Sequence, residues 1–340
     1  MAPSLSKIAV AGALALAPSA LAGFKPDGQD NISVYWGQNG ANGADTQGRL
    51  REYCGDNGID IINVSFLISI KNPATNFASA GNACTAIDGT QLLRCPEIEE
   101  DIAYCQSQGK TILLSLGGAT YSEGGFDSAS QASDAAQKVW DLFGTNTAAS
   151  ADRPFGQSVV DGFDFDFEST TQNMVPFANK LRDLMDNSGA SKKFLLSAAP
   201  QCVYPDAAMH EMLDGAVSFD FLQVQFYNNW CGVINFSNPN AWNFNVWDQW
   251  ARTTSKNPAV KVLIGVPASP RAGAGYVDGA GLKPIVQDTR NKYPASFGGI
   301  MTWDMSTLYQ NQGMLDGIRA ALAGARASAA RFIRRRAFRA

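Results

Sequence analysis

The chain has 340 residues, enough for one large α/β domain, and a (β/α)8 barrel of about 250 residues with insertions would use nearly all of it. Its formal net charge of −4 includes six arginines in the last fifteen residues, so the remainder carries −10. An acidic body argues against nucleic acid and anionic lipid as partners and suits a neutral polymer.

Both ends of the chain have a distinctive composition. Residues 1–22 have the pattern of a secretory signal peptide, with Lys7 as its charge, an apolar region at 8–17 and Ala20-Leu21-Ala22 as a cleavage site. This apolar run is too short to span a bilayer, and no other stretch is long and apolar enough. We therefore expect a secreted, soluble protein, extracellular or associated with a cell wall, with one folded domain at 23–324. The Arg-rich segment 325–340 is expected to be a disordered tail.

Between these ends, β-prone runs alternate with amphipathic stretches. Strands are predicted at residues 32–36, 59–66, 111–116, 162–168, 194–199, 221–227, 261–266 and 298–303. Helices are predicted at residues 46–53, 96–107, 132–143, 175–185, 205–212, 241–254, 282–292 and 311–322. This alternation predicts a single-domain parallel (β/α)8 TIM barrel rather than an open doubly wound sheet. No G-x-G-x-x-G or P-loop pattern follows a strand, which argues against a dinucleotide cofactor.

Residues 71–95 form a long insertion rich in Asn, Ala and Thr, which we expect to be irregular. It contains Cys84 and Cys95, and a bond at these residues would hold it in place. Long ordered loops of this kind often lie beside a binding cleft.

The cysteines are even in number, which fits an oxidising compartment. Spacing alone leaves fifteen possible pairings. No C-x-x-C pattern occurs and His210 is the only histidine, so a zinc site is disfavoured and a Ser-His triad would have to use that one residue. The six are Cys54, Cys84, Cys95, Cys105, Cys202 and Cys231.

The stretch 161–168 reads DGFDFDFE and alternates acid with phenylalanine, the period of a β-strand. One face then carries Asp164, Asp166 and Glu168, and the other face needs an apolar layer to cover its three Phe side chains. Acids about 7 Å apart along one strand face repel when all are ionised, so at least one is expected to hold a proton near neutral pH. A carboxyl that stays protonated at working pH can act as a general acid.

Two other interpretations of these acids remain open. The residues between them are Phe, which does not fit an EF-hand loop, but a divalent metal on the strand stays possible. Purely structural carboxylates are less favoured, because stacked buried acids cost several kcal/mol when no basic residue lies in the segment to pair with them.

The stretch matches the D-G-x-D-x-D-x-E signature of glycoside hydrolase family 18, and the chain resembles the plant-type and fungal class III chitinases of that family over nearly its whole length. The resemblance implies the disulfides Cys54–Cys105, Cys84–Cys95 and Cys202–Cys231. It implies that Glu168 protonates the glycosidic oxygen and later acts as base. Asp166 would orient the substrate acetamide and share a proton with Asp164. Asp161 has the wrong parity for the acidic face, and we expect a structural role for it.

Other site residues also follow from the resemblance. At the end of the strand predicted at 221–227, Tyr227 is expected to donate a hydrogen bond to the acetamido oxygen. Gln225 and Asn228 would line the same subsite, and Trp303 would form the floor under the sugar ring. The remaining candidates for substrate binding, each with a core or turn role as the alternative, are Tyr35, Phe66, Trp230, Ser115 and Gly118.

The expected function is that of a secreted, monomeric chitinase that uses no cofactor and no metal. It would hydrolyse β-1,4-linked N-acetylglucosamine with retention, using the substrate's own acetamido group as the nucleophile and passing through an oxazolinium intermediate. An endo-β-N-acetylglucosaminidase acting on N-glycans and a non-catalytic chitin-binding lectin on the same barrel are the alternatives.

Overall fold

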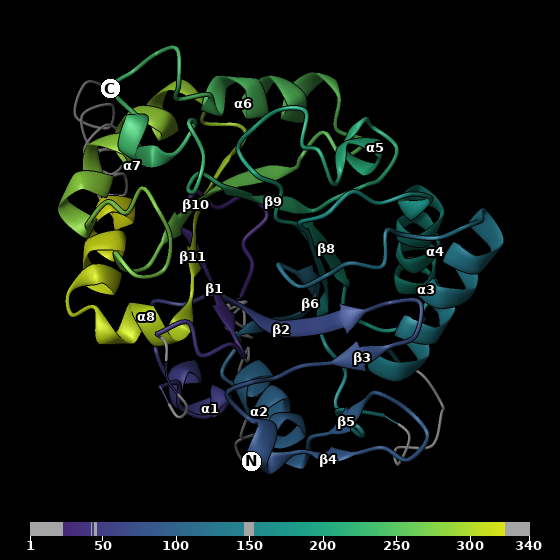
Figure 1. Cartoon of the computed structure of the whole chain (residues 1–340). Helices are drawn as coiled ribbons and strands as arrows, with labels where there is room; N and C mark the ends of the chain where they lie inside the picture. Colours follow the sequence, from purple (N-terminus) through teal and green to yellow (C-terminus); the bar gives the residue numbers. More distant parts are fainter. Residues whose placement is uncertain (1–22, 42, 44–45, 146–152, 324–340) are drawn as a thin grey trace, which may run out of the picture.

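Parallel strands close into a ring at the centre of the molecule (Figure 1). The computed structural model describes residues 23–41, 43, 46–145 and 153–323, so the predicted signal peptide (1–22) and basic tail (325–340) lie outside the described residues. Because β1 pairs with both β2 and β11, the ring is closed, and the predicted (β/α)8 barrel is confirmed. In ring order the strands are β1 (Asn31–Trp36), β2 (Ile61–Ser69), β6 (Thr111–Gly118), β7 (Gly162–Phe167), β8 (Leu195–Ala198), β9 (Phe221–Gln225), β10 (Lys261–Pro267) and β11 (Phe297–Trp303).

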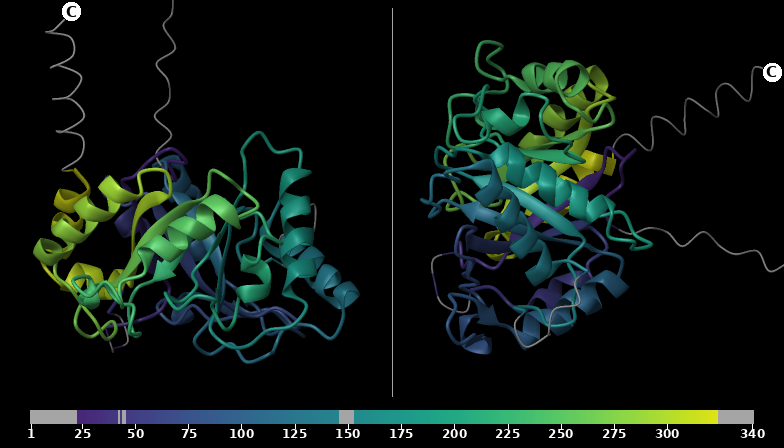
Figure 2. Two further views of the ribbon diagram at one scale, coloured as in Figure 1. Left: turned by 90° about the horizontal axis from the view of Figure 1, so that it is seen from above. Right: turned by 90° about the vertical axis from the view of Figure 1, so that its right-hand side faces the viewer.

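Helices surround this ring on the outside (Figures 1 and 2). Two of the longer helices begin where the sequence supplies a capping side chain: Ser128 accepts the backbone N–H of Gln131 at 3.3 Å, and Asp278 accepts that of Gly281 at 2.8 Å. None of the helices in the described residues has the length and apolar character needed to cross a membrane. The labelled helices in Figure 1 are α1 (Leu50–Cys54), α2 (Pro96–Ser107), α3 (Ala129–Phe143), α4 (Met174–Asp186), α5 (His210–Leu213), α6 (Phe244–Thr253), α7 (Gly279–Lys292) and α8 (Met305–Gln310).

The helix predicted at 205–212 is wrong for most of its length, because α5 is only four residues long. The carboxylate of Asp206 accepts the backbone N–H groups of Gln201 (3.0 Å), Ala208 (2.9 Å) and Met209 (2.7 Å). A carboxylate that takes up these donors holds the segment in a turn and competes with a helical ladder.

Other helices also differ from the prediction in where they begin. The helix predicted at 46–53 begins at Leu50, since the preceding Arg49 has an extended backbone with ψ of 146°. Helix α8 was not predicted; it starts at a capping box in which Asp304 and Thr307 exchange side-chain and backbone hydrogen bonds. The last predicted helix, at 311–322, is present at residues 314–323.

The insertion at 71–95 is more regular than expected. Its strand β3 (Ala74–Thr75) pairs antiparallel with β2, and β4 (Thr85–Ala86) pairs with β5 (Leu93–Arg94). The 3-10 turn η1 (Gly81–Ala83) lies between them. The insertion therefore extends the β2 wall of the barrel beyond its carboxyl end.

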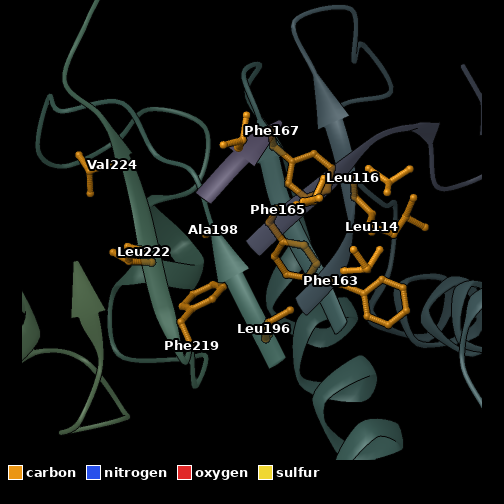
Figure 3. Close-up of a cluster of buried hydrophobic side chains, with 14 of the residues drawn as sticks. Leu114, Leu116, Phe163, Phe165, Phe167, Leu196, Ala198, Phe219, Leu222 and Val224 are labelled. Atoms are coloured by element: carbon orange, nitrogen blue, oxygen red, sulfur yellow. The ribbon is translucent and has the colours of Figure 1, made fainter. Parts of the chain in front are cut away.

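The three phenylalanines of β7 point out of the barrel into the layer beneath the helices (Figure 3). Phe163, Phe165 and Phe167 are at most 1% exposed. The ring of Phe165 lies 5.8 Å from that of Phe177 on α4, and the ring of Phe163 lies 6.4 Å from that of Trp140 on α3. This packing fixes the strand face, so the alternating acids must point into the barrel.

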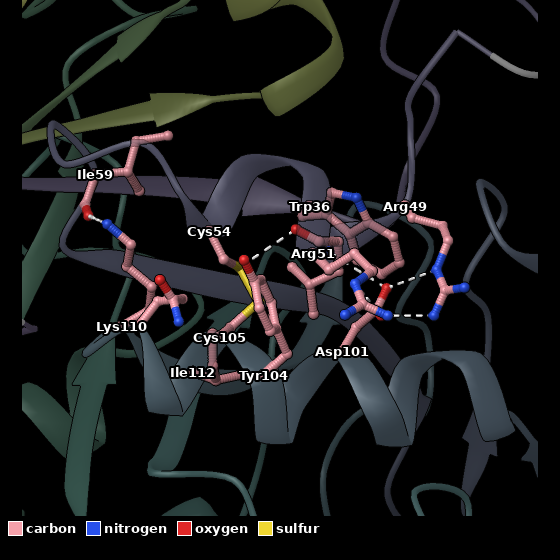
Figure 4. The surroundings of a disulfide bond; sticks show 12 residues. Trp36, Arg49, Arg51, Cys54, Ile59, Asp101, Tyr104, Cys105, Lys110 and Ile112 are labelled. Atoms are coloured by element: carbon pink, nitrogen blue, oxygen red, sulfur yellow. Dashed lines mark hydrogen bonds and ion pairs between the residues drawn. A yellow bond between two sulfur atoms is a disulfide. The ribbon is translucent and has the colours of Figure 1, made fainter.

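All three disulfides implied by the family resemblance are present, namely Cys54–Cys105, Cys84–Cys95 and Cys202–Cys231. The first joins α1 to α2 (Figure 4). Beside it, Arg49 forms an ion pair with Asp101 at 2.6 Å. The third joins the loops that follow β8 and β9, and both of these loops reach the carboxyl end of the barrel.

Aspartates at the opposite, amino-terminal end of the barrel clasp neighbouring strands. Asp60, Asp161 and Asp220 each precede a strand and accept a backbone N–H from the adjacent strand, at 2.9, 2.8 and 2.9 Å respectively. Asp161 also pairs with Lys192 at 2.6 Å. The expected structural role of Asp161 is consistent with this position.

Candidate active site

The acids of β7 lie at increasing height toward the carboxyl end of the barrel. Asp164 is fully buried, Asp166 is 4% exposed, and Glu168, one residue beyond the strand, is exposed. The chain therefore places one carboxyl deep in the barrel and one at the surface of the pocket, with Asp166 between them.

Asp164 accepts four hydrogen bonds. Its Oδ2 accepts the hydroxyls of Tyr35 at 2.7 Å and Ser115 at 2.8 Å. Its Oδ1 accepts the hydroxyl of Ser197 at 2.6 Å and the amide Nε2 of Gln223 at 2.9 Å. Burial raises the pKa of Asp164, and these donors oppose that rise. Two donors on each oxygen suit an ionised carboxylate.

Asp166 has a different environment. Its carboxylate accepts one hydrogen bond, from Gln225 Nε2 at 3.0 Å. Burial, and then the charges of Glu168 and Asp164, raise the pKa of Asp166 well above its usual value. No hydrogen bond joins Asp166 to Asp164 within the described residues, so the proton sharing expected between them has no direct contact to support it.

Glu168 is also held toward its protonated form. Partial burial raises the pKa of its carboxyl, contact with Gln225 lowers it, and the charge of Asp206 raises it. A carboxyl at a pocket surface with a raised pKa can deliver a proton to a bound substrate.

The hydroxyl of Tyr227 is available to a ligand. Tyr227 follows β9, is 7% exposed and lines the pocket above the acids. Its hydroxyl makes no hydrogen bond with any residue that the structure describes. Burial and the nearby Asp166 and Glu168 raise the pKa of Tyr227, so the hydroxyl keeps its proton and remains a donor.

The pocket has a volume of about 290 Å³ and an aromatic floor. The Trp303 ring lies 5.5 Å from the ring of Tyr35 and 5.9 Å from that of Phe66, which is nearly parallel to it. A flat apolar floor beneath convergent polar groups is suited to a sugar ring, which has apolar faces and a polar rim. The lining consists of Tyr35, Gln38, Phe66, Ile68, Asn76, Ala119, Thr120, Asp166, Glu168, Gln201, Gln225, Tyr227, Asn228, Asn229, Ala272, Met301 and Trp303.

Most of the candidates from the sequence line this pocket, but Asp164, Ser115, Gly118 and Trp230 do not. Ser115 is fully buried and donates to Asp164, so it supports the site from below. A Cβ on Gly118 would lie 2.9 Å from the ring of Phe66, so this glycine leaves room for the ring. Trp230 is 55% exposed and lies outside the pocket.

Several pocket residues were not predicted. Gln38 lies in the loop after β1, at the end of the barrel where the catalytic residues of such folds lie. Met301 lies two residues before Trp303 and so points to the same face of β11. The sequence could therefore have predicted both as pocket residues. Asn76 and Gln201 come from irregular segments that no periodic pattern marks. In the part of the chain that the structure describes, no three His, Cys, Asp or Glu side chains come together so that they could hold a metal ion.

Comparison with known proteins gives consistent matches. Residues 31–292 match the model of glycosyl hydrolases family 18. Endochitinase 33 of Trichoderma harzianum is 51% identical over 317 residues, covering 92% of this chain and 97% of the relative. A class III chitinase of Arthroderma benhamiae is 44% identical and covers 89% of each chain. The crystal structure of a xylanase and α-amylase inhibitor protein from Scadoxus multiflorus superimposes with a TM-score of 0.69 at 30% identity, covering 85% of this chain and 97% of the other.

Proposed function

Because this chain belongs to family 18 of the glycosyl hydrolases and resembles its class III chitinases, we propose that it cleaves the β-1,4 linkages of chitin with retention of configuration. The observation that carries the proposal is that Glu168, Asp166 and the Tyr227 hydroxyl meet in one pocket with Trp303. A proton donor, a carboxyl acceptor and a neutral hydrogen-bond donor then surround the position of a single sugar ring.

In the first step, the Glu168 carboxyl gives its proton to the glycosidic oxygen. The bond from C1 to that oxygen breaks, and the carbonyl oxygen of the substrate's 2-acetamido group forms a bond to C1. The products are an oxazolinium ion and a free hydroxyl on the departing chain. The raised pKa of Glu168 supports this role, because it favours the protonated form that donates to the substrate.

Two residues act on the acetamido group. Tyr227 donates its hydroxyl proton to the acetamido oxygen and holds it near C1. Asp166 accepts the acetamido N–H, and the negative charge of the Asp164–Asp166 pair stabilises that nitrogen as it becomes positive. Gln225 already donates to Asp166 at 3.0 Å and limits how the carboxylate can turn.

In the second step, Glu168 removes a proton from water, and the water oxygen attacks C1 from the side of the departed chain. The bond from C1 to the acetamido oxygen breaks and restores the acetamide. Two inversions at C1 give net retention. The three disulfides support an extracellular location, since such bonds persist in oxidising compartments. We propose that the protein acts there as a monomer.

Two other functions are less well supported. An endo-β-N-acetylglucosaminidase would use the same acetamido chemistry, and only its substrate differs. A non-catalytic lectin or inhibitor on this barrel is the other alternative, and the similar structure from Scadoxus multiflorus is described as an inhibitor of xylanase and α-amylase. A protein that only binds needs no proton donor beside an acetamide-orienting acid. This chain retains Glu168, Asp166 and Tyr227 together, which favours an enzyme.

The test is product analysis on colloidal chitin beside a high-mannose glycoprotein, with wild type, Glu168→Gln and Glu211→Gln. Glu211 is an exposed acid on α5 and serves as a matched control. We expect soluble chitin oligomers from wild type and Glu211→Gln, and a loss of at least about 100-fold in Glu168→Gln, since only the transferable proton is removed. Wild-type turnover in Glu168→Gln, or release of glycan in place of chitin oligomers, would refute the proposal.

A further inference from the structure

The barrel interior beneath the active site is polar in one layer and apolar in the next. Ile61, Leu113, Phe221 and Leu263 close the lower barrel. Above them lie buried side chains with hydrogen-bonding groups, which have no part in the family's acidic signature. These are Ser33, Asn63, Ser197 and Gln223, all fully buried.

Hydrogen bonds fix which way the Gln223 amide faces. Its oxygen Oε1 accepts the Ser33 hydroxyl at 2.6 Å and Asn63 Nδ2 at 3.0 Å. Asn63 Nδ2 also donates to the Ser33 oxygen at 3.0 Å, which leaves the Ser33 proton for Gln223. With its oxygen satisfied on that side, Gln223 turns Nε2 toward Asp164 Oδ1 at 2.9 Å. The reverse orientation would set the Gln223 carbonyl against a carboxylate.

The charge on Asp164 therefore depends on neutral donors. Within the described residues no cation forms an ion pair with Asp164. The titratable groups that face it are Tyr35 on β1, Asp166 on its own strand β7 and Tyr227 after β9, and none of these brings a positive charge. Each donor to a buried, unpaired carboxylate is consequently worth more than it would be beside a cation.

We propose that Gln223, oriented by Asn63 and Ser33, is a positioning residue that keeps Asp164 ionised and so confines the proton of the Asp164–Asp166 pair to Asp166. This rests on the proposed function, in which Asp166 faces the acetamido group. Four donors occupy the two oxygens of Asp164 and leave no site for a proton, whereas Asp166 accepts only from Gln225. Gln223 touches neither the pocket nor the substrate and acts through Asp164.

The proposal predicts opposite pH effects for two substitutions. In Gln223→Leu the donor is lost, Asp164 takes up a proton more readily, and the acid limb of the kcat/KM profile moves up by about one to two pH units. In Gln223→Glu the shape is kept; the protonated glutamic acid can still donate, but its anion repels Asp164. Activity in that variant should survive on the acidic side and fall as the new carboxyl ionises.

Gln106 offers a matched control. It donates Nε2 to Asp161 at 3.0 Å at the other end of the barrel, so Gln106→Leu and Gln106→Glu make the same chemical changes at an aspartate remote from the reaction. These variants should leave the pH limbs in place, whatever they do to stability. A purely structural role for Gln223 would likewise lower activity at all pH values without moving a limb.

A second readout needs no activity. The measurement uses the Glu168→Gln variant with ¹³C-labelled aspartate carboxyl groups. The carboxyl ¹³C chemical shift of Asp164 should titrate at higher pH when Gln223 is changed to Leu. If Gln223→Leu does not fold, Ser33→Ala removes one of the orienting bonds and should give a smaller shift of the same sign. Unmoved limbs and an unmoved Asp164 titration in these variants would overturn the proposal. Absence of chitin hydrolysis in wild type, with the Asp164 shift still present, would instead refute the proposed function alone.

Discussion

The Tyr227 hydroxyl provides the sharpest test of the site, because no residue that the structure describes forms a hydrogen bond with it. Tyr227→Phe removes one donor from the pocket and leaves none of the described groups without its partner. Its free energy of unfolding should change by no more than about 0.5 kcal/mol, as for other changes that break no contact. Catalysis should suffer far more, since losing one donor to a developing charge lowers kcat by about 100- to 1,000-fold.

Tyr35→Phe is the matched control, because its hydroxyl donates to Asp164 at 2.7 Å and the residue is 1% exposed. Losing a hydrogen bond to a buried charged group should lower the free energy of unfolding by about 1.5–3 kcal/mol. The assays are urea unfolding and steady-state hydrolysis of a soluble chitin oligomer. We expect kcat to fall more than KM rises in Tyr227→Phe, since its hydrogen bond strengthens in the transition state. A Tyr227→Phe enzyme with wild-type kcat, or one as destabilised as Tyr35→Phe, would refute the role of a free donor.

Three further changes test other parts of the structure. Asp166→Asn should raise the melting temperature at pH 7 and leave it unchanged near pH 4. The folded-state pKa of Asp166 is raised, so its carboxyl contributes stability below its unfolded pKa and loses that contribution as the pH rises through the folded pKa. An equal gain in melting temperature at both pH values would contradict this sign. Replacing Cys202 and Cys231 by Ala opens a loop of 29 residues and should lower the free energy of unfolding by about 3.5 kcal/mol. On heating, the variant should lose activity at a lower temperature than it unfolds, which paired heat-inactivation and circular dichroism curves would measure. Trp230→Ala should leave hydrolysis of a short soluble oligomer within about twofold of wild type, because this side chain lies outside the pocket; a larger loss would extend the site to it.

The sequence predicted most where one local pattern had one structural outcome. Residues 161–168 alternate acids with phenylalanines, and the three phenylalanines had to be buried under the helices. The acids on the opposite face of the strand therefore had to point into the barrel. Trp303 and Tyr227 were assigned from the family resemblance, and both line the pocket. Family resemblance supplied the disulfide partners, which spacing alone could not.

The remaining features depend on contacts between distant segments. Asp206 replaces a predicted helix with a turn by binding three backbone N–H groups, and no local pattern marks such competition. The Gln223 layer was missed because a lone glutamine in an apolar strand does not show whether its amide meets an acid on another strand. Ser115 was wrongly assigned to the substrate because the sequence does not show how high a residue lies in the barrel. Strand register pairs Ser115 with Asp164, one level below the pocket.

Closure of the strand ring has a consequence for how the protein meets other chains. Each barrel strand forms hydrogen bonds with a neighbouring strand along both of its edges. In the described residues the edge strands are β3, β4 and β5, and each is two residues long. Such short margins offer almost no template for another chain to extend the sheet. The closed ring therefore offers little opportunity for edge-to-edge aggregation.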